Sequence, residues 1–314
     1  MVITLGTLRL AAVTLLDRAI VRFLPVVPKP VVKLISSPYI AGASLDDAVR
    51  VVRRLNAEGK LATIDVLGEE ITREAEARAI AQENREVFEA IEREGLDSNV
   101  SVKPTGLGLE LSYDLCRENL EGLLTEAAKN GNFVRIDMED SSTTSETLRL
   151  YRELRERGFD NVGVVLQAYL RRTLDDIRSL ADLRPNVRLC KGIYIEPPSI
   201  AFTDYDAVRA NFVQCLDALL EEGAYVGVAT HDEWLIGQAL SRVAGMAPGD
   251  YEFQMLLGVR EQRSSELVAA GHRLRVYVPY GVQWYQYSLR RLQENPAMAG
   301  TIARATVGRV LGRS

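Results

Sequence analysis

Short apolar or β-branched runs recur along the chain and alternate with longer segments whose apolar positions have helical spacing. No run is joined to the next by a two-residue hairpin turn, so the pattern predicts parallel strands with helical crossovers. Units of about 30 residues of this kind can close into a (βα)8 barrel, the TIM-type α/β fold that we predict. The eight runs are residues 61–68, 99–106, 133–140, 162–169, 187–194, 225–232, 251–258 and 274–281.

A doubly wound open sheet is the structural alternative. It would be favoured by a glycine fingerprint after the first strand, but residues 106–111 have two glycines and lack a third at the required spacing. The chain also lacks a phosphate-binding loop of the Walker type and a nucleophile elbow.

Residues 1–60 have a different pattern, and we expect them to form an N-terminal helical segment that packs on a barrel of residues 61–314. Helices are predicted at 46–59 and 70–94. Residues 8–28 are the most apolar stretch, but charged residues interrupt it, so we expect an amphipathic helix without a transmembrane span or signal peptide. That helix packs on the domain, or it lies on a membrane surface or a partner.

Composition narrows the function. The 314 residues are 47% hydrophobic and 26% charged with a formal net charge of −5, which is typical of a globular protein and unlike a general nucleic-acid binder. The three cysteines are not closely paired, so a disulfide scaffold and a cysteine-rich zinc site are excluded, and a reducing compartment fits. Two histidines make a multi-histidine metal site a poor interpretation, and we expect no metal.

Each strand-like run turns polar near its end. In a (βα)8 barrel these side chains gather at the C-terminal mouth, where active sites lie, and Tyr277 is expected to end the last strand. The residues are Asp65, Lys103, Asp137, Gln167, Lys191, Thr230, His231 and Tyr277.

The segment 283–295 contains a cluster of charged residues. If it is helical, Tyr287, Arg290, Arg291 and Glu294 share one face. Adjacent arginines that are partly buried need an anion, and a guanidinium binds a carboxylate bidentately. The alternative is a solvated face with an Arg–Glu pair. With Lys103 as a third cation, and with apolar surface from Leu256, Tyr277 and Tyr287, the cluster favours a small carboxylate as ligand.

A second cluster surrounds residues 188–197. Arg188 and Lys191 are expected on the fifth strand, with Gln167, Thr230 and His231 at neighbouring mouth positions. This group of hydrogen-bonding side chains suits a flat heterocycle that carries a phosphate group, and it resembles a flavin pocket more than a metal site. The alternatives are an ion pair inside the barrel and a histidine with a structural hydrogen bond.

Residues 61–297 resemble the proline dehydrogenase family, in its monofunctional bacterial form. The matching segments occur in family order, and the fourth and last are the most specific: SVKPTGLG, RIDMED, LQAY, RLCKGIYIEP, ATHD, YEFQMLLGV, VYVPYG and YSLRRLQEN. The resemblance implies a (βα)8 flavoprotein that binds FAD non-covalently and oxidises L-proline to Δ1-pyrroline-5-carboxylate, the first step of proline catabolism. It also implies electron transfer to a membrane quinone, a cytoplasmic chain with peripheral membrane association, and a transient contact with a Δ1-pyrroline-5-carboxylate dehydrogenase.

The resemblance also implies roles for individual residues. The catalytic residues are Asp137, Arg188 and Tyr277. The substrate-binding residues are Lys103, Leu256, Tyr277, Tyr287, Arg290, Arg291 and Glu294. The flavin-binding residues are Met138, Gln167, Arg188, Lys191, Gly192, Ile193, Thr230 and His231.

Three residues depart from the family pattern. Cys190 and Ile193 stand where Val and Ala are usual, and Asp232 stands where Asn is usual. These departures bear on cofactor affinity and on the rate of flavin reoxidation.

Two other functions fit the residues alone. A Schiff-base aldolase would use Lys103 or Lys191 as nucleophile. A non-catalytic carboxylate-binding protein would bind proline or an analogue without a chromophore.

Overall fold

The computed structural model describes residues 37–68, 71–285 and 287–288. The predicted amphipathic helix at 8–28 lies outside the described residues, and so do Arg290, Arg291 and Glu294. The division into a segment 1–60 and a barrel 61–314 therefore stays a prediction.

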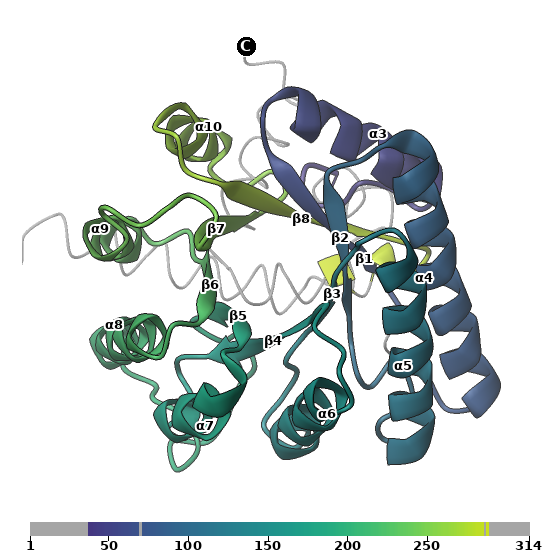
Figure 1. Ribbon diagram of the computed structural model, residues 1–314, viewed down its shortest axis with the longest axis horizontal. Helices are drawn as coiled ribbons and strands as arrows, with labels where there is room; N and C mark the ends of the chain where they lie inside the picture. The colour runs from purple at the N-terminus through teal and green to yellow at the C-terminus, as the bar shows by residue number, and fades with distance from the viewer. Residues whose placement is uncertain (1–36, 69–70, 286, 289–314) are drawn as a thin grey trace, which may run out of the picture.

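Eight parallel strands form a closed barrel in chain order, with β1 paired to β8 (Figure 1). The predicted (βα)8 fold is confirmed, and the open-sheet alternative is wrong because the sheet has no edge. The strands are β1 (Leu61–Val66), β2 (Ser98–Val102), β3 (Val134–Ile136), β4 (Val162–Gln167), β5 (Asn186–Cys190), β6 (Tyr225–Ala229), β7 (Tyr251–Leu256) and β8 (Leu274–Tyr280).

Helices surround the barrel as an outer ring (Figure 1). Helix α3 (Leu45–Ala57) begins at a capping box in which Ser44 and Asp47 satisfy each other's backbone N–H groups. Its apolar face joins the main core, and the helix packs against β1 and β8. The helices that follow are α4 (Glu74–Glu94), α5 (Tyr113–Lys129), α6 (Thr144–Glu156), α7 (Thr173–Leu180) with a short 3-10 turn η2 (Ala181–Leu183), α8 (Tyr205–Glu221), α9 (Glu233–Arg242) and α10 (Glu261–Ala269).

The strands alternate between an apolar face and a polar face. On β7, Tyr251, Phe253 and Met255 belong to the main apolar core, whereas Glu252 and Gln254 form hydrogen bonds with other strands of the barrel. Successive side chains of a strand point to opposite faces, so one face packs on the helices and the other fills the barrel. The barrel interior is therefore polar, and its groups must find partners there.

Two strand glycines make room for buried polar side chains. A Cβ at Gly163 on β4 would lie 2.4 Å from Arg135 Nη1, and one at Gly227 on β6 would lie 2.4 Å from Gln254 Nε2. A Cβ at either position would displace these side chains, so glycine lets long side chains from β3 and β7 lie over the neighbouring strand.

Candidate active site

A cavity of about 550 Å3 lies at the carboxyl ends of the strands. This is the face of a (βα)8 barrel that holds active sites. Its wall contains every predicted site residue that the structure describes: Lys103, Asp137, Met138, Gln167, Arg188, Lys191, Gly192, Ile193, Thr230, His231, Leu256, Tyr277 and Tyr287.

Strand geometry explains most of these positions. Gln167 is the last residue of β4, and Lys103 and Asp137 directly follow β2 and β3. Two expectations need correction, because Lys191 lies one residue beyond β5, and Tyr277 lies three residues before the end of β8. Tyr277 points inward from within the strand rather than from its end.

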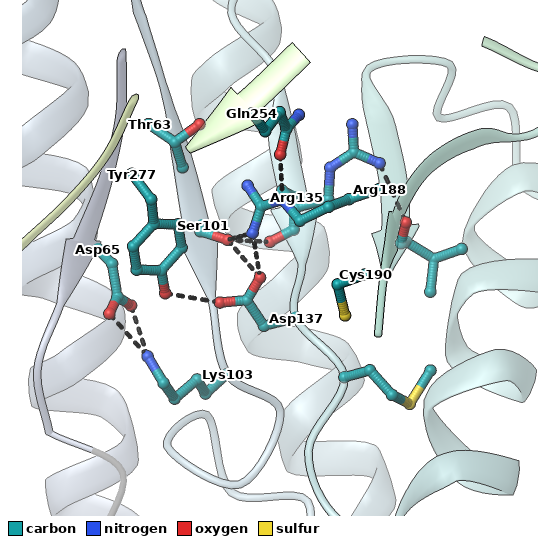
Figure 2. Close-up of polar contacts among 12 residues, drawn as sticks. Thr63, Asp65, Ser101, Lys103, Arg135, Asp137, Arg188, Cys190, Gln254 and Tyr277 are labelled. Carbon is teal, nitrogen blue, oxygen red and sulfur yellow. Dashed lines mark hydrogen bonds and ion pairs between the residues drawn. The ribbon is translucent and has the colours of Figure 1, made fainter. Parts of the chain in front are cut away.

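Asp137 is the centre of the hydrogen-bond network below the cavity. Its Oδ1 accepts hydrogen bonds from Ser101 Oγ at 2.6 Å and from Arg188 Nη1 at 2.7 Å. Its Oδ2 accepts one from the Tyr277 phenol at 2.8 Å (Figure 2). Four strands or strand ends thus meet at one carboxylate, which fixes the position of Arg188 and Tyr277.

Tyr277 remains a neutral donor in this network. Burial and the charges of Asp137 and Asp65 raise the pKa of its phenol well above its usual value. The Arg188 guanidinium lies 5.2 Å from the centre of the same ring, close enough for a cation–π contact. The interior ion pair that was the alternative for Arg188 is present, and the same residue also lines the cavity.

Lys103 forms an ion pair that the sequence did not suggest. Its ammonium donates to both oxygens of Asp65 on β1, at 2.7 and 2.8 Å (Figure 2). The Asp65 side chain is 1% exposed, so the Lys103 ammonium stabilises a charge that lies out of contact with water. The lysine that was expected as a cation for the ligand, or in the alternative as a Schiff-base nucleophile, also binds a buried carboxylate.

Asp232 lines the cavity and accepts hydrogen bonds from three neighbouring polar side chains. Its carboxylate accepts hydrogen bonds from Lys191 Nζ at 3.3 Å, from Tyr205 at 2.6 Å, and from Arg209 at 2.8 and 2.9 Å. It also caps the N-terminus of α9. Burial alone would raise its pKa, but Arg209, Tyr205 and Lys191 outweigh burial and hold the pKa of Asp232 well below its usual range.

His231 makes the structural hydrogen bond that was its alternative interpretation. Its Nε2 accepts the backbone N–H of Leu256 at 2.9 Å, which requires that Nε2 carry no proton. The neighbouring Thr230 Oγ1 accepts the backbone N–H of Asp232 at 3.1 Å. Both residues therefore shape the loop after β6 while they line the cavity.

Gln167 presents an acceptor without a partner. Its Nε2 donates to the carbonyls of Met138 and Glu139 at 3.3 and 3.2 Å, which fixes the orientation of the amide. Its Oε1 is buried and accepts no hydrogen bond within the described part of the chain. A buried acceptor of this kind is costly unless a ligand N–H completes it.

Gly192 brings backbone close to an aromatic ring at the cavity wall. Its φ is +104°, and a Cβ there would lie 2.1 Å from the Tyr169 ring. Only glycine satisfies both conditions, so the loop after β5 leaves its backbone uncovered at the cavity.

Sequence reasoning missed four groups of this site: Ser101, Gln254, Glu139 and Tyr205. Gln254 lies two residues before Leu256 on β7, so the alternation of side chains along a strand could have placed it inside the barrel. Ser101 is two residues before Lys103 and could have been found in the same way.

Within the described residues, His, Cys, Asp and Glu side chains form no group of three or more that could bind a metal ion, and no helix has the length and hydropathy of a membrane span.

Comparison with known proteins identifies relatives along most of the chain. A family model described as "Proline dehydrogenase" matches residues 48–304. Proline dehydrogenase 1 of Bacillus subtilis (strain 168) is 41% identical over 266 residues, which cover 84% of this chain and 88% of that protein. The proline dehydrogenase of Deinococcus radiodurans is 38% identical over 270 residues, which cover 84% and 87%.

Solved structures agree with the fold. Proline utilization A (PutA) from Bdellovibrio bacteriovorus, inactivated by N-propargylglycine, matches with a TM-score of 0.77 and 27% identity over 83% of this chain. PutA from Corynebacterium freiburgense has a TM-score of 0.74 at 22% identity over 94% of this chain, a likeness of fold alone. The chain spans about a third of the length of these structures, 32% and 34%. From the family match and the curated relatives, the chain belongs to the proline dehydrogenase family.

Proposed function

We propose that this protein oxidises L-proline to Δ1-pyrroline-5-carboxylate with a bound flavin as the immediate electron acceptor. The observation that carries the proposal is the cavity at the barrel mouth, in a member of this family, with Arg188, Asp137 and Tyr277 joined in one network at its floor. A flavin is the cofactor that the family implies, and we propose FAD specifically.

The residues of the cavity fit a flavin. Gln167 Oε1 is a buried acceptor that an N–H of a flat heterocycle would complete, and Gly192 leaves backbone open to close approach. Lys191 lies at the same wall and can meet a phosphate. We assign flavin binding to the family-matched set: Met138, Gln167, Arg188, Lys191, Gly192, Ile193, Thr230 and His231.

The substrate would occupy the part of the cavity between Lys103, Leu256, Tyr277 and Tyr287. The two tyrosines and the leucine offer apolar surface to a pyrrolidine ring, and Lys103 offers a cation to its carboxylate. Arg290, Arg291 and Glu294 lie outside the described residues, and their assignment as the carboxylate clamp rests on the sequence.

The protein orients the reactants and stabilises charge. When bound, the flavin supplies the acceptor for a hydride from the ring carbon next to the proline nitrogen. The cations hold the carboxylate so that this carbon faces the cofactor, and orientation of this kind contributes up to about 7–11 kcal/mol. Arg188, held by Asp137, would stabilise negative charge on the bound cofactor. Tyr277 excludes water beside the ring, and its phenol keeps its proton while it donates a hydrogen bond to Asp137.

The lysine contacts weigh against the aldolase alternative. A Schiff-base nucleophile must be free to attack a carbonyl, but the Lys103 amine donates hydrogen bonds to both oxygens of Asp65. Lys191 is likewise bound to a carboxylate, that of Asp232.

We extend the proposal to a membrane quinone as the acceptor that takes electrons from the reduced flavin. The protein would bind the membrane surface peripherally, and it would contact a Δ1-pyrroline-5-carboxylate dehydrogenase transiently. Turnover with a soluble quinone in the absence of oxygen supports the acceptor, and turnover that requires oxygen contradicts it.

Reconstitution with FAD, FMN and riboflavin tests the activity. We expect FAD to restore formation of the imine product from L-proline. Restoration by FMN alone would contradict the choice of FAD. A colourless protein that borohydride traps with a keto substrate would favour the aldolase, and proline binding without a chromophore would favour a binding protein.

The proposed carboxylate clamp is tested by variants. We expect Arg290→Met or Arg291→Met to lose about 2–5 kcal/mol of transition-state binding.

A further inference from the structure

A polar row runs along β7 from the bottom of the barrel to its mouth. Glu252, Gln254 and Leu256 alternate on the inward face of this strand. Glu252 lines a cavity at the amino ends of the strands, whereas Leu256 lines the mouth cavity. Gln254 lies between them, so it can connect the interior of the barrel to the proposed active site.

The Gln254 amide has one orientation that satisfies its neighbours. Its Nε2 donates to Glu252 Oε1 at 2.6 Å. Its Oε1 accepts from Arg188 Nε at 2.6 Å (Figure 2). A carboxylate can only accept and a guanidinium can only donate, so the amide must face Glu252 with nitrogen and Arg188 with oxygen. The hydrogen-bonding capacity of its two partners therefore fixes the orientation of the amide.

Glu252 is itself held from below. The Arg275 guanidinium donates to its two oxygens at 2.7 and 3.1 Å, and the carboxylate is 1% exposed. Burial alone would raise the pKa of Glu252, but the charge and hydrogen bond of Arg275 and the hydrogen bond from Gln254 outweigh burial and lower it. Glu252 therefore acts as a fixed acceptor for the Gln254 amide.

Gly227 leaves the space that this amide occupies. A Cβ at Gly227 would lie 2.4 Å from Gln254 Nε2 and 2.9 Å from its Cδ. An alanine there would push the amide out of line between Glu252 and Arg188 without changing its chemistry.

These contacts account for two of the three guanidinium nitrogens of Arg188. Nε is bound by Gln254, and Nη1 is bound by Asp137 and Ser101. Nη2 has no acceptor within the described residues, and Arg188 lines the mouth cavity. The protein thus fixes the side of the guanidinium that faces the barrel and leaves the other nitrogen for a ligand.

We propose that Gln254 is a positioning residue for the proposed reaction, and that Glu252 and Gly227 hold its amide so that Arg188 is aimed at the flavin. The inference rests on the proposed function. A cation next to a flavin stabilises the negative charge of the reduced form, so displacement of Arg188 lowers both the midpoint potential and the rate of hydride transfer.

The test uses the FAD-loaded protein and two variants that disturb the amide by different routes. Gln254→Met removes both hydrogen bonds at similar volume, and Gly227→Ala displaces an intact amide. We expect each to lower kcat for L-proline by about 10- to 100-fold, with a smaller change in KM and a more negative flavin midpoint potential.

A matched control separates positioning from structural support. Thr63 is fully buried in the same barrel interior and donates a hydrogen bond to Asn99 without touching Arg188. Thr63→Val should lower the melting temperature while it leaves the potential and kcat unchanged.

The outcomes divide clearly. A fall of potential and kcat in both test variants, with neither changed in Thr63→Val, supports the inference. A wild-type potential in Gln254→Met, or changes no larger than those of Thr63→Val, overturns it. Failure of the proposed function would show in the wild-type protein itself, as absence of flavin binding or of proline oxidation before any variant is compared.

Discussion

The Tyr277 phenol on β8 donates a 2.8 Å hydrogen bond across the barrel to Asp137 Oδ2, which lies directly after β3. The same carboxylate binds Arg188 through its other oxygen at 2.7 Å. Asp137 therefore couples the wall of the proposed substrate site to the arginine of the proposed flavin site. Loss of either hydrogen bond to Asp137 should therefore change the position of the other partner.

Removal of the phenol hydroxyl tests this coupling. Tyr277→Phe keeps the buried ring but deprives Asp137 of one hydrogen bond, and hydrogen bonds to charged groups contribute about 1.5–3 kcal/mol. We expect kcat/KM for L-proline to fall by about 10- to 100-fold, measured at steady state. Because the pKa of Tyr277 is raised, the wild-type protein should show no loss of activity from tyrosine ionisation near pH 10. Equal kcat/KM in the two proteins would contradict the coupling.

The Lys103–Asp65 pair should contribute to stability as well as to activity. Lys103→Met removes the ammonium that binds both oxygens of the buried Asp65 carboxylate and should lower the free energy of unfolding by about 3–5 kcal/mol. Addition of Asp65→Leu removes that charge and should restore most of the stability, measured by urea denaturation. Activity should stay low in the double variant because the proposed carboxylate ligand is still absent. Recovery of wild-type kcat/KM would refute the substrate role of Lys103.

The loop after β5 should tolerate no side chain at Gly192. Gly192→Ala combines a positive φ with a clash against Tyr169, and strain of this kind costs about 1–3 kcal/mol. We expect lower stability and weaker FAD binding, measured by thermal denaturation and by flavin titration. Gly237 in α9 has open space around it, so Gly237→Ala should be neutral or stabilise the protein by about 0.5–1 kcal/mol. Unchanged FAD affinity in Gly192→Ala would remove this loop from the flavin site.

Asp232 should make stability depend on pH in the acid range. Its pKa is lowered in the folded protein, so its contribution is present above the unfolded value of about 3.9 and is lost as pH falls through the folded value. Asp232→Asn should cost about 1–3 kcal/mol at pH 7, and the cost should shrink below about pH 4.

The half-exposed Arg242–Asp217 pair provides the control for that measurement. Asp217→Asn should change the free energy of unfolding by less than about 1 kcal/mol at pH 7. A pH-independent difference between wild type and Asp232→Asn would show that the ionised form of Asp232 contributes nothing.

The barrel and the cavity wall could be predicted because each depends on local periodicity. Short apolar runs with a helix between each pair of runs predict the (βα)8 fold, and residues near strand ends gather at one mouth whatever their pairing. Lys103, Gln167 and Arg188 could be placed at the cavity on that basis.

Contacts between side chains of different strands could not be predicted in the same way. The Lys103–Asp65 and Arg188–Gln254 contacts join strands whose relative height depends on the stagger of the closed sheet, which no single strand encodes. Lys103 was therefore expected as a cation for a ligand, and its buried carboxylate partner was not foreseen. The roles of all site residues stay predictions.

Anaerobic mixing of the FAD-loaded protein with L-proline tests the central claim most directly, because it isolates electron transfer from substrate to cofactor. We predict that the flavin absorption bleaches within a single turnover, with one imine formed for each flavin reduced. A flavin that keeps its oxidised spectrum in the presence of saturating L-proline would contradict the account.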